Sequence, residues 1–153
     1  MATILEQKSQ IDKLWETFWS NGISNPLTVI EQISYLFFIK ELDEKHTREE
    51  RKANRLNRPI ENPVFDETPK QQNMRWSKFK DFAPSEMYKV VQEDVFPFIK
   101  NMGGENFAKY MKDAVFMIPS PALLATAVDM IDKLEMQDLD TKGDLYEYIL
   151  AKI

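Results

Sequence analysis

The sequence predicts an all-α protein: a compact bundle of five to seven helices with one long irregular basic loop. Apolar residues recur at intervals of three and four along most of the chain, which is the spacing of one helix face. Segments with the alternating pattern of strands are scarce, and residues typical of helix starts and ends separate the apolar stretches. At 153 residues, 43% of them hydrophobic, the chain is long enough for one domain with a sizeable core.

The first helix is predicted from the apolar stripe that begins at Ile11. Leu14 and Phe18 follow it at helical spacing, so the three side chains share one face. Asn21-Gly22 should end this helix, because both residues tolerate the left-handed backbone conformation found at helix ends. The aromatic residues of the helix cannot all point one way, and Trp19 is the one that we expect to contact a neighbouring domain or subunit.

A second helix is predicted to begin with Asn25 as its N-cap and Pro26 as its first residue. Residues 35–39 are all apolar or aromatic, which a buried strand would also explain, but the flanking residues favour a helix and the segment is too long for a strand. We therefore expect a central helix that is buried on several sides. Its polar continuation over residues 45–58 is either a solvated helix or a frayed loop.

Residues 45–80 form a basic island on an acidic chain. They contain ten Lys or Arg and five Asp or Glu, a net +5, whereas the whole chain carries −5. Pro59 and Pro63 should end any helix here, so we expect a long, partly extended connection as far as Asn73. Loops of this length are usually functional or mobile. A local basic island on an acidic chain is what we expect if a single surface contacts nucleic acid while the rest of the protein stays soluble.

Further helices are predicted toward the C-terminus. Ser85 should be the N-cap of a helix that Pro97 kinks or ends near Phe96. Gly103-Gly104 should precede a short helix, and Ser120-Pro121 should begin the clearest amphipathic helix of the chain.

A final helix is predicted from the capping box that Thr141 and Asp144 form. It reaches Ile153 without the residues that usually close a helix. We therefore expect residues 1–153 to be one helical N-terminal domain that continues into a longer protein.

The residues offer little for catalysis or for metal binding. The chain has no cysteine, which excludes thiol chemistry and cysteine-bound metals, and its single histidine, His46, is predicted to be a solvated surface residue. Gly103-Gly104 lacks the context of a phosphate-binding loop. The sequence has neither a signal-like start nor an apolar stretch long enough to cross a membrane, so we expect a cytoplasmic protein.

Two basic clusters are candidate DNA-binding residues. In a continued helix the first cluster would lie along one face toward a phosphate backbone, and the second adds an aromatic residue able to stack on a base. The alternatives are a solvated helix face balanced by Glu49 and Glu50, and a core position for the aromatic residue. The candidates are Arg48, Arg51, Lys52, Arg55, Arg58, Arg75, Trp76, Lys78 and Lys80.

Two groups of residues resemble a known family. The first comprises Leu14-Trp15, Trp19, Asn25-Pro26, Tyr35-Leu36-Phe37 and Lys40-Glu41-Leu42-Asp43, and the second is the segment at residues 140–150. The first resembles the opening of the modification (M) subunit of type I restriction-modification systems. The second resembles the segment that leads, in that family, from the helical N-terminal domain to the catalytic domain.

The resemblance implies a parent protein that transfers a methyl group from S-adenosylmethionine to N6 of adenine in DNA. It implies partners as well: duplex DNA, a specificity subunit, a second modification subunit and, for cleavage, a restriction subunit. The family's helical domain is thought to close around DNA, and its cofactor and catalytic residues would lie beyond Ile153. This chain would then carry no catalytic or cofactor-binding residue of its own.

One short motif needs separate weighing against this family. Asn62-Pro63-Val64-Phe65 is similar to the Asn-Pro-Pro-aromatic motif with which adenine methyltransferases hold a flipped base. Its third residue is Val and no cofactor-binding strand precedes it, so an ordinary X-Pro turn is favoured. For the whole chain, the alternative to DNA contact is a helical protein-interaction module. A self-sufficient small enzyme has no support in these residues.

Overall fold

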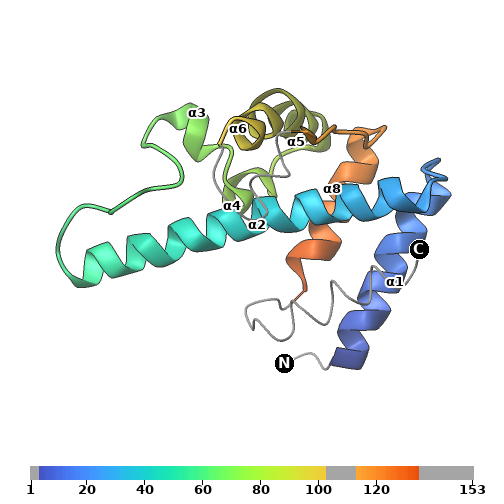
Figure 1. Cartoon of the computed structure of the whole chain (residues 1–153), viewed down its shortest axis with the longest axis horizontal. Helices are drawn as coiled ribbons and strands as arrows, with labels where there is room; N and C mark the ends of the chain where they lie inside the picture. The colour runs from blue at the N-terminus through green and yellow to red at the C-terminus, as the bar shows by residue number, and fades with distance from the viewer. Residues whose placement is uncertain (1–3, 103–112, 135–153) are drawn as a thin grey trace.

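The computed structural model of this protein describes residues 4–102 and 113–134, which contain helices and no strand (Figure 1). The predicted all-α fold is therefore confirmed. The predicted helices after Gly103-Gly104 and after Thr141 lie outside the described residues. The described elements are α1 (Ile4–Ser20), α2 (Pro26–Arg55), α3 (Pro69–Gln72), α4 (Trp76–Phe79), α5 (Pro84–Val90), the π-helical turn η1 (Val91–Val95), α6 (Phe96–Lys100) and α8 (Pro121–Asp132).

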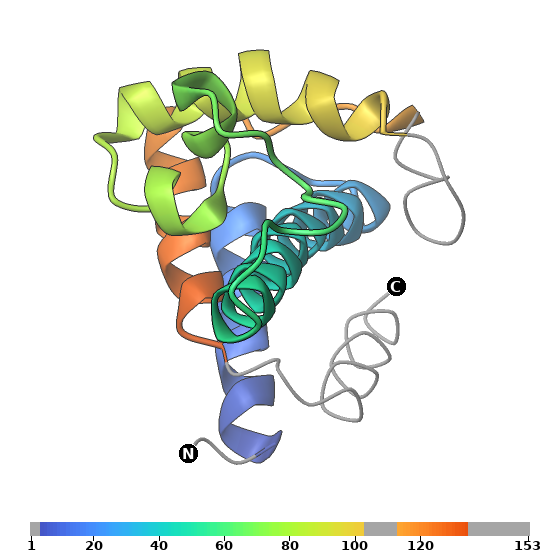
Figure 2. The same ribbon diagram turned by 90° about the vertical axis from the view of Figure 1, so that its left-hand side faces the viewer.

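Helix α2 is the axis of the fold. Its N-terminal half contacts α1 and α8, and the predicted apolar run is buried there, including Leu36, Phe37 and Ile39. Viewed along α2, helices α1 and α8 pack beside each other while α5 and α6 lie across the top (Figure 2). The C-terminal half of α2 projects beyond the other helices as an arm (Figure 1). One helix thus provides both the centre of the core and an extension away from it.

The start of α2 and the turn before it follow the prediction. The Asn25 side chain accepts a hydrogen bond from the Leu27 N–H at 2.9 Å, and Pro26 is the first residue of the helix. Gly22 has φ +97°, a conformation that residues with a side chain rarely adopt. These local signals fix where α1 ends and where α2 begins.

Of the two alternatives for residues 45–58, the helical one is observed as far as Arg55. The irregular connection therefore begins at Leu56, where Asn57 and Asn62 have positive φ angles of 53° and 51°. It returns along α2 before the short helices α3 and α4.

The start of the next helix differs from the prediction, and of the two alternatives given for Pro97, a kink or an end of the helix, the end is not observed. Helix α5 begins at Pro84 with Ala83 as N-cap, so Ser85 is not the cap, because the proline already sets the first helical position. Pro97 does not end the helix, which continues to Lys100 as α6. The Phe96 N–H instead bonds the Val91 carbonyl five residues back, so the chain makes a π turn just before the proline.

The extended link from residue 114 to residue 119 is bonded by the buried amide of Gln32 and, at Ile118, by the Tyr88 hydroxyl at 2.7 Å. Gln32 donates from Nε2 to the Val115 carbonyl at 2.9 Å and accepts from the Met117 N–H at 3.0 Å. Ser120 then accepts from the Leu123 N–H at 3.2 Å, which confirms the predicted start of α8. Through this link α8 is brought back against α1, α2 and α5.

Candidate nucleic-acid interface

The arm of α2 has two opposite faces. Because a helix turns by about 100° per residue, Asp43, His46, Glu50 and Ala53 share the face turned toward the rest of the molecule. The opposite face is exposed, and within the described part of the chain no ion pair involves its last four basic residues. We call this the basic face: Lys45, Arg48, Arg51, Lys52 and Arg55.

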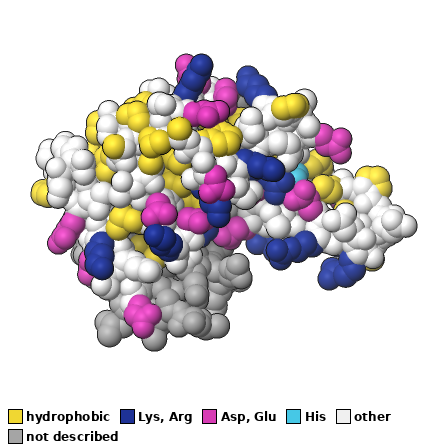
Figure 3. Space-filling view, turned by 180° about the vertical axis from the view of Figure 1, so that it is seen from behind, with side chains coloured by type: hydrophobic (Ala, Val, Ile, Leu, Met, Phe, Trp, Pro, Cys, Tyr) yellow, Lys and Arg dark blue, Asp and Glu magenta, His cyan; other side chains and the backbone are white. Residues whose placement is uncertain are grey.

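The basic face is visible from the side opposite to Figure 1. Figure 3 shows Lys and Arg side chains along the lower edge of the projecting arm. The structure thus places four of the predicted DNA-binding residues, Arg48, Arg51, Lys52 and Arg55, on one surface. Arg58 lies just past the end of α2, where its Nη1 is 3.2 Å from a Glu61 carboxylate oxygen.

A groove of about 610 Å³ lies between the arm and α4. Arg48 and Arg51 line it from α2, Ser77 lines it from α4, and Lys80 lines it from the C-cap of α4. Asp132, at the end of α8, also lines it. The groove therefore brings residues of the two predicted basic clusters together. Lys78 is exposed on α4 but does not line the groove.

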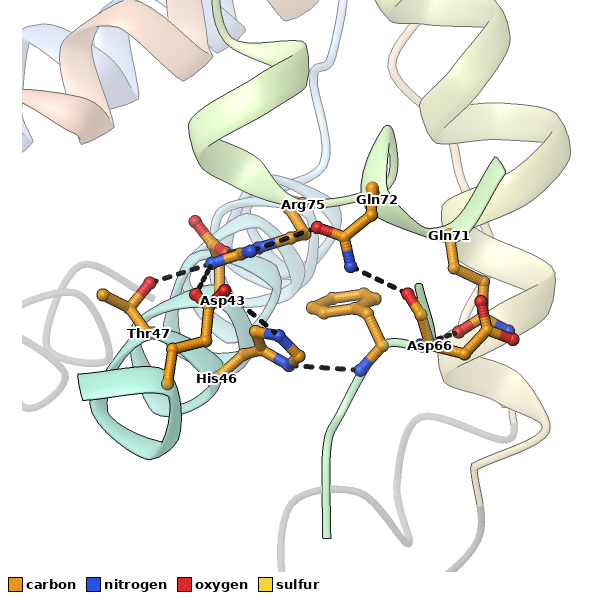
Figure 4. Close-up of polar contacts among 9 residues, drawn as sticks. Asp43, His46, Thr47, Asp66, Gln71, Gln72 and Arg75 are labelled. Atoms are coloured by element: carbon orange, nitrogen blue, oxygen red, sulfur yellow. Dashed lines mark hydrogen bonds and ion pairs between the residues drawn. The ribbon is translucent and has the colours of Figure 1, made fainter. Parts of the chain in front are cut away.

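Arg75 is not part of this surface, because it is only 6% exposed and bonded inside the molecule (Figure 4). Its Nε donates to an Asp43 oxygen at 2.5 Å, and its Nη2 donates to Glu50 at 2.8 Å and to Thr47 at 3.0 Å. Its Nη1 donates to Gln72 at 3.2 Å. Burial lowers the pKa of Arg75, but the bonds to Glu50 and Asp43 outweigh it and leave the pKa raised. Arg75 is therefore an internal structural residue and is not positioned for the predicted DNA contact.

Asp43 links this arginine to the start of α4. Its second oxygen accepts the Ser77 N–H at 2.9 Å, which satisfies one of the free donors in the first turn of that helix. The Asp43–Arg75 pair thus fastens α4 and the returning connection to the inner face of α2.

Trp76 is a core residue, the alternative that the sequence left open. It is 3% exposed, its ring meets Phe79 edge-on with centroids 5.5 Å apart, and its Nε1 donates to Asp132 at 2.9 Å. The other Asp132 oxygen lies 3.2 Å from the Lys80 Nζ. Burial raises the pKa of Asp132, but the bonds from Trp76 and Lys80 outweigh it and lower the pKa. The Trp76 ring is therefore not available for stacking on a base.

The prediction of a solvated His46 is wrong. Its side chain is 2% exposed because the connection folds back over it, with the Phe65 N–H 3.4 Å from Nδ1. The Phe65 ring packs between His46 and Phe98, at centroid distances of 5.7 and 5.3 Å. Burial and then the Arg75 charge lower the pKa of His46. The aromatic of the Asn62-Pro63-Val64-Phe65 motif is thus a packing residue.

One signal in the sequence could have located the buried histidine. Asp43, His46 and Glu50 are three, four and seven residues apart, which places them on one helix face opposite the basic residues. The partner that covers this face comes from a distant segment and carries no such signal.

Trp19 lies at the end of α1 and is 47% exposed. Its side chain is therefore accessible, and its contact with a partner stays a prediction. No group of three His, Asp or Glu side chains suited to a metal ion occurs among the described residues. Likewise, no helix in residues 4–102 and 113–134 has the length and apolar character needed to span a membrane.

Comparison with known proteins gives a consistent result. Residues 7–131 match the family model described as the HsdM N-terminal domain. No curated protein matches the chain. A solved structure titled for the complex assembly and conformational transition of the type I R-M system is similar in fold, with a TM-score of 0.66 at 17% identity. The similarity covers 94% of this chain but only 30% of that chain.

Proposed function

The chain belongs to the HsdM N-terminal domain family, that of the modification subunit of type I restriction-modification systems, and we propose that it is the subunit's DNA-embracing and assembly domain. The parent protein then transfers a methyl group from S-adenosylmethionine to adenine N6 in the cytoplasm. It works with a specificity subunit and a second modification subunit, and with a restriction subunit when DNA is cleaved.

The observation that carries the proposal is the basic face of α2. Its charges are exposed, and the last four have no carboxylate partner within the described residues. The eleven residues from Lys45 to Arg55 are separated by ten steps of about 1.5 Å, so they span about 15 Å. Phosphates of one DNA strand follow each other at about 3.4 Å along the duplex axis, so the face matches about four of them.

Contacts of this kind hold DNA without reading its sequence. Lys and Arg side chains on phosphates fix the position of a protein on the duplex, whereas sequence is read at the base edges. The buried state of Trp76 agrees with this role, because no aromatic residue is offered to a base at this surface. Choice of the target sequence is therefore assigned to the specificity subunit.

The salt dependence of binding to a random-sequence duplex tests the proposal. Four phosphate contacts predict a slope of about −3.6 in a plot of log affinity against log salt, from about −0.9 per contact. Replacing Arg51, Lys52 and Arg55 together by Ala should bring the slope to about −0.9.

A matched control removes the same charge elsewhere. Lys89, Lys100 and Lys133 are exposed and lie on α5, on α6 and just after α8. Their triple Ala variant should keep the steep slope. Equal slopes for the two triple variants would refute a specific role of the basic face.

A second candidate, a helical protein-interaction module without direct DNA contact, is favoured by exposed apolar side chains. Trp19, Val115 and Met117 are all about half exposed, and exposed aromatics often anchor protein contacts. A gel-shift assay at low salt, run beside size exclusion with the specificity subunit, separates the two functions. Comigration with the subunit but no shift of duplex at any protein concentration would favour the interaction module.

A further inference from the structure

We infer that the groove between α2 and α4 seats a phosphodiester of the strand that the basic face follows, with Lys80 as the contact on the second wall. The inference rests on the proposed function and extends it from one helix to two. It makes the DNA-binding site a cleft with two walls.

Arg48 and Arg51 make the groove continuous with the basic face. They belong to that face on α2, and both also line the groove. On the helix they lie about 60° apart, with Arg51 at the edge of the face nearer to the groove and Arg48 near its middle. A phosphate chain held by Lys52 and Arg55 is therefore led by these two guanidinium groups to the mouth of the groove.

The carboxylates in the groove are already neutralised. Asp43 is bonded to Arg75 and to the Ser77 N–H, and a Glu44 oxygen lies 3.9 Å from the Lys40 Nζ. Asp132 accepts from Trp76 with one oxygen and pairs with Lys80 through the other. Arg48 and Arg51 have no carboxylate partner among the described residues, so they give the groove an excess of positive charge.

Lys80 places an ammonium group on the opposite wall. Its side chain is about one-third exposed, and one hydrogen-bonding direction goes to Asp132 at 3.2 Å. An ammonium carries three donors, so others remain for an anion in the groove. Arg48, Arg51 and Lys80 thus approach the same space from two helices.

The chemistry of the groove favours a sugar–phosphate backbone over a base. Among the described residues, Trp76 supplies the only aromatic ring in the groove lining, and this ring is packed against Phe79. No flat apolar slot is therefore available for stacking. Cationic side chains without an aromatic platform are suited to phosphate contacts, which carry no sequence preference.

Lys78 and Lys80 provide the test, because Lys78 is on α4, Lys80 is the C-cap of that helix, both are exposed, and only Lys80 lines the groove. Lys80 adds a fifth contact to the four of the basic face, so the salt slope for random-sequence duplex and the whole 153-residue chain should be about −4.5, and Lys80→Ala should bring it to about −3.6. Lys80→Arg, which keeps the charge, should restore the slope. Lys78→Ala should leave it within about 0.2 of the original.

The outcomes separate the inference from the proposed function. If the salt slope is unchanged in Lys80→Ala but flattened in the triple variant of α2, the phosphodiester site in the groove is refuted and DNA binding by the basic face is retained. Equal flattening by Lys78→Ala and Lys80→Ala also overturns the groove, because position would not matter. A triple variant that binds like the original chain refutes the proposed function itself. Urea unfolding of each variant confirms that the fold is retained.

Discussion

At the scale of single residues, the guanidinium of Arg75 is the one cation bonded to the buried Asp43 carboxylate among the described residues. Replacing Arg75 by Met keeps most of the side-chain volume but leaves Asp43 buried with only the Ser77 N–H. Removing one partner of a buried pair typically costs about 3 to 5 kcal/mol, so we expect a loss of that size in the free energy of unfolding.

Urea unfolding measures this loss, and an exposed ion pair serves as the control. Lys133 lies 2.9 Å from Asp129, and both side chains are about two-thirds exposed. Lys133→Met should change the free energy of unfolding by less than about 0.5 kcal/mol. A cost below about 1 kcal/mol for Arg75→Met would show that Asp43 finds solvent or another donor.

His46 should make the stability depend on pH. Burial and the Arg75 charge lower its pKa in the folded state, while Glu50 and Asp43 oppose them with smaller effects. Below the unfolded value of 6.5 the unfolded chain therefore binds more protons than the folded chain. The contribution of His46 is complete above about pH 6.5 and is lost as the pH falls through this value and toward the lowered pKa.

Replacing His46 by Asn isolates this effect, because the chain has one histidine. The Asn oxygen can still accept the Phe65 N–H, but it does not titrate. Urea unfolding at about pH 7.5 and about pH 5.5 should show a smaller fall in stability for the variant than for the original chain. If the stability of the variant and that of the original chain fall by the same amount, His46 is not the source of the pH dependence.

Two residues of the candidate site that sequence reasoning placed wrongly share one property. Arg75 and His46 are polar side chains whose surroundings come from segments far along the chain, Asp43 for the first and Phe65 for the second. Arg75 is locally indistinguishable from Lys78, since both stand in the same basic and aromatic stretch. The caps Asn25 and Ser120 were predictable because their bonds reach only two and three residues ahead.

At the scale of elements, the turn between α1 and α2 depends on one glycine. Gly22 has φ +97° and an added Cβ would meet nothing within 4 Å, so the cost of a side chain here is conformational. Gly22→Ala should lower the free energy of unfolding by about 1 to 2 kcal/mol. Ser20→Ala, in the last turn of α1, is the control in the same urea experiment and should stay within about 0.5 kcal/mol.

Why α2 is helical to Arg55 could not be settled from its own residues. The polar stretch has neither a clear stop nor an apolar stripe, so a helix and a loop fit equally well. In the structure its inner face is covered from outside, by Phe65 over His46 and by Arg75 on Asp43 and Glu50. The helix is therefore completed by tertiary contacts, which local patterns do not encode.

At the scale of the whole molecule, fold class followed from periodicity, since apolar stripes at helical spacing bury one core. The central position of α2 was predicted for the same reason. The candidate site was only partly predictable: α2 supplied its basic face, whereas the groove needed the packing of α4 and α8 against that helix.

The function proposed for the chain leads to one prediction about its cofactor. The sequence contains no glycine-rich loop after a strand, which S-adenosylmethionine binding of the expected kind would use. Calorimetric titration of the 153-residue chain with S-adenosylmethionine should give no saturable heat, whereas duplex DNA at low salt should give one. A saturable isotherm with the cofactor would contradict the division of labour proposed here.

The unbroken course of α2 has a mechanical consequence. Its 30 residues make a rod of about 45 Å, with one half clamped in the core and the other half free on its outer side. A tilt of about 5° in the clamped half displaces the far tip by about 2 Å, since the free half is about 22 Å long. A small change of packing around Ile33 and Leu36 would therefore move Arg55, at the far end of the same helix, by a larger distance. We therefore expect substitutions deep in the core to change the DNA affinity proposed for the basic face, although the substituted side chains lie far from that face.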